Sequence, residues 1–270
     1  MKQDTILVTA GRDPHANFGV VNPPVYHAST ILFPTLAAWT ESRSESFPGV
    51  RYGLRGTPTT FALEEAVAAA EDGFRSVAVA SGLAAVDIAL IAFLKAGDHL
   101  LMVDTVYAPT RRFCDGILRR FGVETTYYDP LAGAGLAGLM RPNTRVVFLE
   151  SPGSLTFEVQ DVAAIAAAAH ARDAMVILDN TWASPLYFKP FKHGVDVSVQ
   201  AVTKYIAGHA DAMLGALITT EEVHDEVRRT AIMIGACPGP DDCYLAQRGL
   251  RTLGVRLRRH QETADRKSVV

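Results

Sequence analysis

The sequence predicts an α/β fold in which helices flank a mainly parallel mixed sheet. From residue 59 onward, helical stretches alternate with short β-branched runs, and each run ends in Gly, Asp, Glu or Pro. The composition agrees, because 49% of the 270 residues are hydrophobic and 20% are charged, which is enough to bury a large core. Residues 1–58 contain several prolines and little helical periodicity. They predict an extended N-terminal arm that reaches a neighbouring chain.

The elements of this fold follow one another at short intervals. Helices are expected where Ala-rich or periodic stretches occur, at residues 61–71, from 81–82 onward, and at 109–121, 162–171 and 241–270. Strands are expected where β-branched, aliphatic or aromatic residues cluster, at residues 76–80, 99–103, 124–128, 145–150, 175–179, 196–201 and 213–219. Ligands of such sheets bind beyond the carboxyl ends of the strands. The residues directly after each strand are therefore the candidates for a functional site.

Charge and cysteine content exclude several classes of protein. Lys and Arg number 26 and Asp and Glu number 29, so the net charge is −3 and no nucleic-acid partner is expected. The three scattered cysteines form neither a disulfide framework nor a zinc motif, so no metal is expected. No apolar run has the length of a signal peptide or of the ~20 residues that span a bilayer. We expect a cytoplasmic protein with no membrane partner.

One motif suggests a different cofactor. Residues 133–138 match G-x-G-x-x-G, a pattern typical of dinucleotide-binding turns and hence of an NAD-dependent enzyme. A helix starting at these glycines would meet Pro142 after barely one turn, too short to present its dipole to a pyrophosphate. Residues 129–132 also separate the preceding strand from the first glycine. We interpret the segment as an Ala/Gly-rich surface connection.

Two side chains near strand ends indicate pyridoxal phosphate. Asp179 closes the strand at 175–179, and Lys204 follows the strand at 196–201, just before a glycine-containing turn. A carboxylate can keep a heterocyclic nitrogen protonated, and a partly desolvated amine can form a Schiff base. Pyridoxal phosphate requires both groups. Taken singly, Asp179 is equally typical of a turn and Lys204 of a solvated surface charge.

A phosphate site is expected where the strand at 76–80 turns into the next helix. Ser81 and Gly82 open that helix, so the backbone N–H groups of Gly82 and Leu83 would meet an anion at the positive end of the helix dipole. Thr203, beside the lysine, adds a hydroxyl donor. An ordinary strand-to-helix turn would explain the same residues.

Three further side chains complete the candidate site. Tyr107 follows the strand at 99–103 and would lay its ring against a pyridine face, although a core tyrosine is the simpler alternative. Tyr52 and Arg55 lie in the arm. If the arm crosses a dimer interface, they reach the phosphate of the partner, and otherwise they are surface residues.

Five motifs in this order resemble the Cys/Met-metabolism family of pyridoxal-phosphate enzymes, fold type I. They are residues 52–56 (YGLRG), 81–85 (SGLAA), 150–154 (ESPGS), 179–183 (DNTWA) and 203–211 (TKYIAGHAD). The resemblance implies that Lys204 is the Schiff-base lysine and that Lys204 and Tyr107 are catalytic. The implied cofactor contacts are Lys204, Asp179, Tyr107, Gly82, Leu83, Thr203 and, from a neighbouring subunit, Tyr52 and Arg55.

The resemblance also implies a division into an arm (1–58), a cofactor-binding large domain (59–245) and the start of a C-terminal domain (246–270). Members of the family continue into a smaller C-terminal domain that supplies the arginine for the substrate α-carboxylate. The chain is therefore expected to be truncated at its C-terminal end, with weak or no turnover by itself. The implied assembly is a homo-oligomer, a dimer of dimers.

The motifs at 150–154 and 179–183 favour the branch of the family that cleaves a carbon–sulfur bond by β-elimination. The implied reaction converts L-cystathionine into homocysteine, pyruvate and ammonia within methionine biosynthesis, and L-cysteine is a possible second substrate. Two alternatives stay open. One is a γ-lyase or γ-synthase of the same family, acting on methionine or homoserine derivatives, and the other is a catalytically impaired fragment that binds pyridoxal phosphate.

Overall fold

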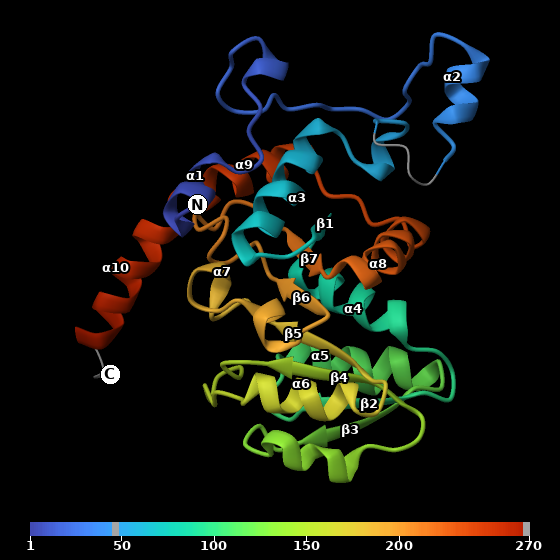
Figure 1. The fold of residues 1–270 in the computed structure, drawn as a ribbon, viewed down its shortest axis with the longest axis vertical. Helices are drawn as coiled ribbons and strands as arrows, with labels where there is room; N and C mark the ends of the chain where they lie inside the picture. The colour runs from blue at the N-terminus through green and yellow to red at the C-terminus, as the bar shows by residue number, and fades with distance from the viewer. Residues whose placement is uncertain (45–48, 267–270) are drawn as a thin grey trace.

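The computed structural model describes residues 1–44 and 49–266, and within them seven strands form one sheet in the order β1-β7-β6-β5-β4-β2-β3 (Figure 1). The strands are β1 (Arg75–Val79), β2 (His99–Val103), β3 (Glu124–Tyr128), β4 (Thr144–Glu150), β5 (Met175–Asp179), β6 (Val197–Gln200) and β7 (Gly215–Thr219). β7 pairs antiparallel with both β1 and β6, whereas the other pairings are parallel. This confirms the predicted mainly parallel mixed sheet.

Helices connect the strands and extend the chain at both ends. They are α1 (Gln3–Thr9), α2 (Leu36–Glu41), α3 (Pro58–Glu71), α4 (Gly82–Phe93), α5 (Ala108–Phe113), α6 (Val162–His170), α7 (Ser184–Tyr187), α8 (Glu221–Met233), α9 (Pro240–Leu250) and α10 (Leu253–Arg266). Shorter helical turns are η1 (His15–Asn17), η2 (Gly53–Arg55), η3 (Cys114–Leu118), η4 (Gly133–Leu139) and η5 (Pro190–His193). The single helix predicted at 109–121 is α5 followed by the π-helical turn η3.

Two hydrophobic clusters cover the two faces of the sheet at β1. Val77 and Val79 pack in the larger cluster, which includes Ile88 of α4. Ala78 points to the opposite face, where it packs in a second cluster with Leu63 of α3. Because successive side chains of a strand alternate between faces, a strand buried on both faces is a continuous apolar run. Burial on both faces therefore explains why the strands appear in the sequence as continuous apolar runs.

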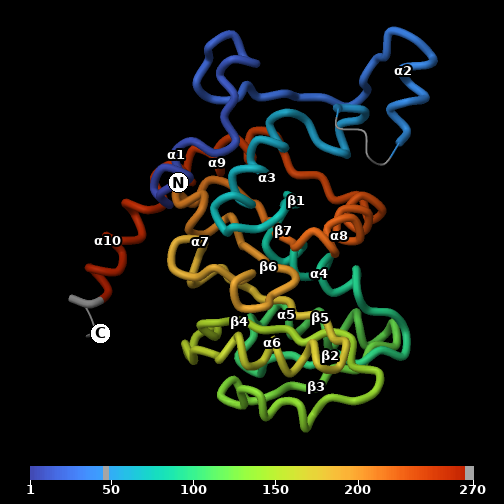
Figure 2. The backbone as a smooth tube through the Cα atoms, in the orientation of Figure 1, coloured from blue at the N-terminus to red at the C-terminus, as the bar shows by residue number. Residues whose placement is uncertain are grey.

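The first helix of the chain packs against the beginning of the last described helix. The segment expected to be an extended arm begins with α1, whose Leu7 is buried in the second cluster together with Leu253 and Leu257 of α10. Figure 2 shows α1 beside α9 and α10, and the rest of the arm running mainly as irregular chain to α3. Residue 246, the expected start of a C-terminal domain, lies inside α9. The parts of these two segments at 45–48 and 267–270 lie outside the described residues.

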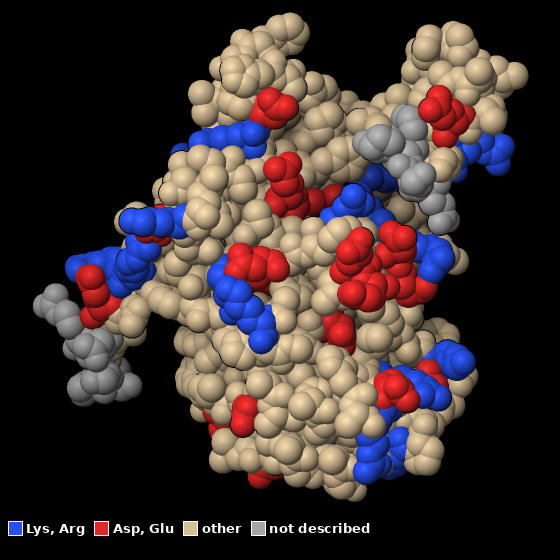
Figure 3. All heavy atoms as spheres, in the orientation of Figure 1, with Lys and Arg blue, Asp and Glu red and all other residues tan. Residues whose placement is uncertain are grey.

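Two surface features bear on the classes considered from the sequence. The glycines at 133–138 lie in the short helical turn η4. A Cβ added at Gly133, Gly135 or Gly138 would meet open space, so no neighbouring segment of the described chain requires glycine there by close contact. Within the described residues, no helix has the length and apolar character needed to cross a bilayer. Figure 3 shows acidic and basic side chains intermixed on the visible face.

The close approach of α4 to β7 requires glycine at residue 215. An ideal Cβ at Gly215 would lie 2.1 Å from the carbonyl oxygen of Ser81, so an alanine there must displace the backbone that begins α4. We expect Gly215→Ala to lower the free energy of unfolding by about 1–3 kcal/mol, measured by urea denaturation. The control, Gly138→Ala, has open space for its methyl group and is expected to leave stability unchanged. Equal midpoints for the two variants would contradict the prediction.

Candidate active site

Two acidic residues lie side by side where β4 and β5 end. Glu150 and Asp179 are opposite one another in the parallel ladder, so both side chains lie at the carboxyl edge of the sheet. Burial and, to a lesser extent, the charge of the neighbouring Asp179 raise the pKa of Glu150 to about 8, against the lowering effects of the Tyr107 N–H and the charge of Lys204. Burial also raises the pKa of Asp179, although its hydrogen bond from Thr181 N–H at 2.9 Å and the charge of Lys204 act in the opposite direction. The site favours a positive charge here.

Lys204 and Tyr107 lie next to these carboxyl groups. The Nζ atom of Lys204 is 5.1 Å from the centre of the Tyr107 ring. The backbone N–H of Tyr107 donates to Oε2 of Glu150 at 2.8 Å, which fixes the start of α5 against the end of β4. The Tyr107 side chain is 41% exposed, so the face of the ring is accessible to a ligand. The structure thus brings together Lys204, Tyr107 and Asp179, which the sequence predicted as site residues. It adds Glu150, which the sequence analysis did not name as one.

The N-terminus of α4 approaches the end of β6. The Ser81 hydroxyl accepts a hydrogen bond from Ala84 N–H at 3.1 Å, which leaves the N–H groups of Gly82 and Leu83 without an acceptor inside the helix. A Cβ at Gly82 would lie 2.6 Å from the Cβ of Ala201, so only glycine fits this approach. The two free N–H groups therefore lie close to the segment that carries Lys204.

Thr203 is engaged with the chain in this structure. Its hydroxyl donates to the carbonyl oxygen of Leu214 at 3.0 Å and accepts from Leu214 N–H at 2.9 Å. A hydroxyl has one proton to donate. An anion bound here would compete with the Leu214 carbonyl for that proton.

A buried carboxyl group lies beneath the site and connects the two strands that carry it. Glu71, at the end of α3, is fully buried, and its Oε1 accepts hydrogen bonds from Asn180 Nδ2 at 2.8 Å and from Gln200 Nε2. Gln200 also donates to the carbonyl oxygen of Asn180 at 3.1 Å. Burial raises the pKa of Glu71. The contact joins the residue after Asp179 to the last residue of β6.

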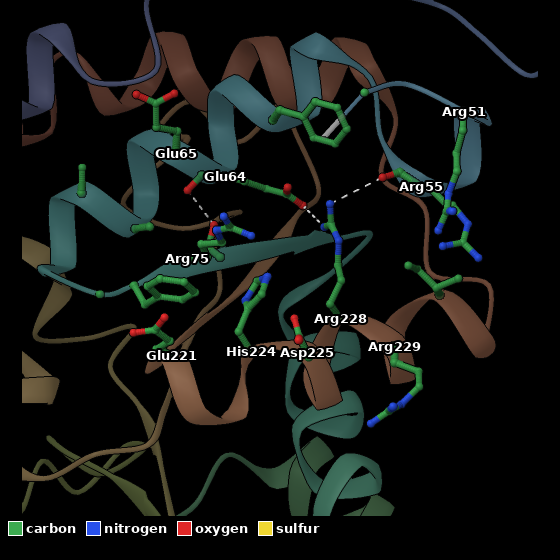
Figure 4. Close-up of a pocket in the computed structure, with 18 of the residues that line it drawn as sticks. Arg51, Arg55, Glu64, Glu65, Arg75, Glu221, His224, Asp225, Arg228 and Arg229 are labelled. Carbon is green, nitrogen blue, oxygen red and sulfur yellow. Dashed lines mark hydrogen bonds and ion pairs between the residues drawn. The ribbon is translucent and has the colours of Figure 1, made fainter. Parts of the chain in front are cut away.

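Tyr52 and Arg55 lie elsewhere in the chain. Arg55 lines a cavity of about 1280 Å³ between the arm, α3 and α8, which does not include Lys204, Asp179 or Tyr107 among its lining residues. Figure 4 shows Arg228 in that cavity donating to Glu64 at 2.6 Å and to the Arg55 carbonyl oxygen at 3.5 Å. Tyr52 is 48% exposed. Within one chain Arg55 therefore lies in a cavity whose lining does not include Lys204, Asp179 or Tyr107, and Tyr52 lies in the arm, where it is bridged to Thr30.

Sequence reasoning did not single out Glu150 as a site residue, although the same pattern that pointed to Asp179 contains it. Both are acidic residues at the end of a strand, and each directly follows a run of buried apolar residues. The pairing of β4 with β5 was needed to place them together. Among the described residues, no group of three or more His, Cys, Asp or Glu side chains is placed to hold a metal ion.

The site has the composition that pyridoxal-phosphate enzymes use, and comparison with known proteins agrees. The chain belongs to the family described as Cys/Met metabolism PLP-dependent enzyme, whose model matches residues 4–268. Pyridoxal phosphate is the cofactor of this family. The structure of metB from Corynebacterium glutamicum has a TM-score of 0.92 and 32% sequence identity, and the match covers 98% of this chain and 68% of that one.

The chain is also similar to curated relatives of differing name. Cystathionine beta-lyase MetC of Escherichia coli is 44% identical over 266 residues, which cover 97% of this chain and 67% of the relative. An L-alanine/L-glutamate racemase of Wolbachia pipientis is 41% identical over 274 residues, covering 98% of this chain and 68% of the relative. The chain spans between 65% and 75% of the length of the first curated relatives that it matches.

The raised pKa of Glu150 predicts a pH-dependent loss of stability. The unfolded chain releases this proton near pH 4.5, whereas the folded chain keeps it up to about pH 8, so the folded state binds more protons between these values. The free energy of unfolding therefore falls as pH rises through this range. We expect Glu150→Gln to reduce that fall by about 1 kcal/mol or more, measured by urea denaturation at a series of pH values.

The control for this experiment is Glu124→Gln, because Glu124 is an exposed carboxylate whose pKa is lowered by hydrogen bonding to Arg141. The Glu124 variant should keep the parental decline above pH 5. Superimposable pH profiles for the parent and the Glu150 variant would show that Glu150 titrates normally.

Proposed function

We propose that the protein is a pyridoxal-phosphate-dependent carbon–sulfur lyase that acts on L-cystathionine by β-elimination, giving homocysteine, pyruvate and ammonia with one water consumed. The observation that carries the proposal is the placement of Lys204 Nζ over the Tyr107 ring, beside the desolvated Asp179 carboxyl. The resemblance to cystathionine beta-lyase MetC supports the substrate and the bond that is broken.

The residues of this chain fit the cofactor in its chemistry. Asp179 is a half-buried residue whose carboxyl group is desolvated and has no ion pair within the described part of the chain, so a protonated pyridine nitrogen would offset the cost of this desolvation. The free N–H groups of Gly82 and Leu83, at the positive end of α4, suit the phosphate, and Thr203 adds a hydroxyl. Tyr107 offers the face of its ring. When bound, pyridoxal phosphate supplies an electron-withdrawing ring that stabilises negative charge at the substrate α-carbon.

Lys204 has two roles in the proposal. With pyridoxal phosphate bound, the Lys204 amine would hold the cofactor aldehyde until the substrate amine replaces it, and Lys204 would then be free to take the proton from the α-carbon. Tyr107 or Lys204 would supply a proton to the departing sulfur atom. Asp179 would pair as a carboxylate with the protonated pyridine nitrogen.

We propose that the chain is divided into an arm (1–58), a cofactor-binding large domain (59–245) and the start of a C-terminal domain (246–270). Tyr52 and Arg55 are proposed to reach the phosphate of a neighbouring subunit, because their own chain places Arg55 in a different cavity. This assigns the active site to a homo-oligomer.

Lys204→Ala tests the central assignment. The purified chain mixed with pyridoxal phosphate should show a visible absorption band of the lysine-bonded cofactor, and Lys204→Ala should lose it, because the bond requires that amine. The control is Lys192→Ala, since Lys192 is a surface residue paired with Asp72 at 3.1 Å. Its spectrum should match that of the parent. A band that survives in the Lys204 variant would refute the role of this lysine.

The products identify the reaction class. With L-cystathionine, β-elimination releases pyruvate, whereas γ-elimination releases 2-oxobutyrate, and a racemase would change only the optical rotation of an amino acid. Product analysis by chromatography separates these outcomes. Pyruvate supports the proposal, and 2-oxobutyrate or epimerisation alone overturns it.

Tyr107→Ala and Tyr107→Phe separate the ring from the hydroxyl. The ring packs beside Lys204 and its loss should weaken cofactor binding several-fold, by about 1 kcal/mol, as measured from spectral titration with pyridoxal phosphate. Tyr107→Phe keeps the ring and should bind the cofactor with parental affinity. If both variants bind equally well, Tyr107 does not contact the cofactor ring.

A further inference from the structure

The turn that carries Lys204 is held by one arginine from α10. Within the turn, Gly208 N–H donates to the Lys204 carbonyl oxygen at 2.8 Å, and Lys204 N–H donates to the Ala201 carbonyl oxygen at 3.0 Å. The carbonyl oxygens of Tyr205 and Ile206 accept hydrogen bonds from Arg256 Nη1 at 2.7 Å and Nη2 at 3.2 Å. The two residues directly after the lysine are therefore fixed to α10 through their backbone.

The same guanidinium holds the junction between α9 and α10. Its Nη2 donates to the Gly249 carbonyl oxygen at 2.8 Å, and its Nε donates to the Thr252 hydroxyl at 3.0 Å. Arginine has five N–H donors, and these contacts use four of them. Arg256 is therefore committed to the protein backbone and has little capacity left to bind the carboxylate of a substrate.

Two glycines provide the space for this arrangement. A Cβ at Gly208, whose φ is +78°, would lie 2.3 Å from Nη1 of Arg256. A Cβ at Gly249 would lie 2.2 Å from the carbonyl oxygen of Ala207. Gly208 thus leaves room for the guanidinium of Arg256, and Gly249 leaves room for the backbone of the lysine turn. The lysine turn and the α9–α10 junction can therefore pack closely against one another.

Aromatic contacts connect the same regions a second time. The ring of Tyr205 lies 6.1 Å from the ring of His260 in α10, nearly perpendicular to it. Tyr205 also lies 6.0 Å from the ring of Trp182, three residues after Asp179. The turn thus contacts both α10 and the segment that follows β5.

From this geometry we propose that Arg256 is a positioning residue for Lys204: by binding the carbonyl groups of the next two residues, it holds the lysine turn in the conformation that directs Nζ toward the Tyr107 ring. The proposal rests on the role assigned to Lys204 under the proposed function. It also means that α10 and the lysine turn move as one unit.

Arg256→Gln tests the proposal, and Arg251→Gln is its matched control. Arg251 also donates to backbone carbonyl groups, those of Leu7 at 3.1 Å and Ala10 at 2.7 Å, but these belong to α1 and the residue that follows it, not to the lysine turn. Arg251→Gln loses two hydrogen bonds to backbone carbonyl groups and Arg256→Gln loses three. A general loss of stability should therefore appear in both variants, whereas a change confined to the lysine turn should appear in Arg256→Gln only. Arg256→Lys is included as the conservative variant, because one ammonium group can reach some of the carbonyl groups but cannot match the planar fork.

The first measurement follows the bond between the cofactor and Lys204. Each full chain is incubated with increasing pyridoxal phosphate and reduced with borohydride, and the labelled fraction at residue 204 is counted by peptide mass spectrometry. Arg256→Gln should need about tenfold more cofactor for half-labelling, Arg256→Lys an intermediate amount, and Arg251→Gln the parental amount. Equal labelling curves for Arg256→Gln and Arg251→Gln would overturn the proposal.

The second measurement does not require the cofactor. Hydrogen exchange of the amides of residues 204, 207 and 208 should be about tenfold faster in Arg256→Gln than in the parent, and unchanged in Arg251→Gln. Unchanged exchange in Arg256→Gln would overturn the positioning role. If instead no chain, the parent included, is labelled at Lys204, the proposed function fails, and the exchange data still decide whether Arg256 holds the turn.

Discussion

The buried contact of Glu71 with Asn180 and Gln200 sets the geometry on which the candidate site depends. One carboxyl oxygen accepts hydrogen bonds from side chains at the ends of β5 and β6, so the strand that carries Asp179 and the strand that leads to Lys204 are fixed relative to one another. Burying a carboxyl group is costly unless its hydrogen bonds are made. The contact is therefore a specific one, since a sheet without these donors would leave the oxygen unsatisfied.

The molecule supports the lysine from two directions. Glu71 accepts hydrogen bonds from the ends of β5 and β6. Arg256, in α10, donates hydrogen bonds to the backbone of the lysine turn itself. Arg256 thus binds the carbonyl groups of the two residues after Lys204, and Glu71 holds the end of the strand that precedes it. A reactive group placed on a rigid support loses less freedom when it meets its partner, which favours reaction.

Local patterns in the sequence were sufficient for the sheet and for part of the site. Asp179 and Lys204 were found because they follow apolar strands, and strands buried on both faces are continuous apolar runs. The Glu71 network could not be found this way, because Glu71 is separated from Asn180 by 109 residues and from Gln200 by 129. Arg256 binds a carbonyl group 51 residues away, and backbone acceptors leave no mark on the sequence. The helix α1 was missed because Leu7 is buried in a cluster of residues that are distant in the chain, among them residues of α3 and α10.

The position of β7 also determines the order in which the sheet can be completed. β7 lies between β1 and β6, and its Thr219 is paired with Arg75 of β1, which precedes it by 144 residues. Since a chain emerges from the ribosome N-terminus first, β1 is made early and must wait for residue 219 before it has a neighbour. Closing so long a loop carries an entropic cost that slows folding. During that interval both edges of β1 are unpaired, whereas in the finished sheet β1 is an edge strand with one side paired to β7, so the nascent chain exposes more unpaired strand than the finished molecule.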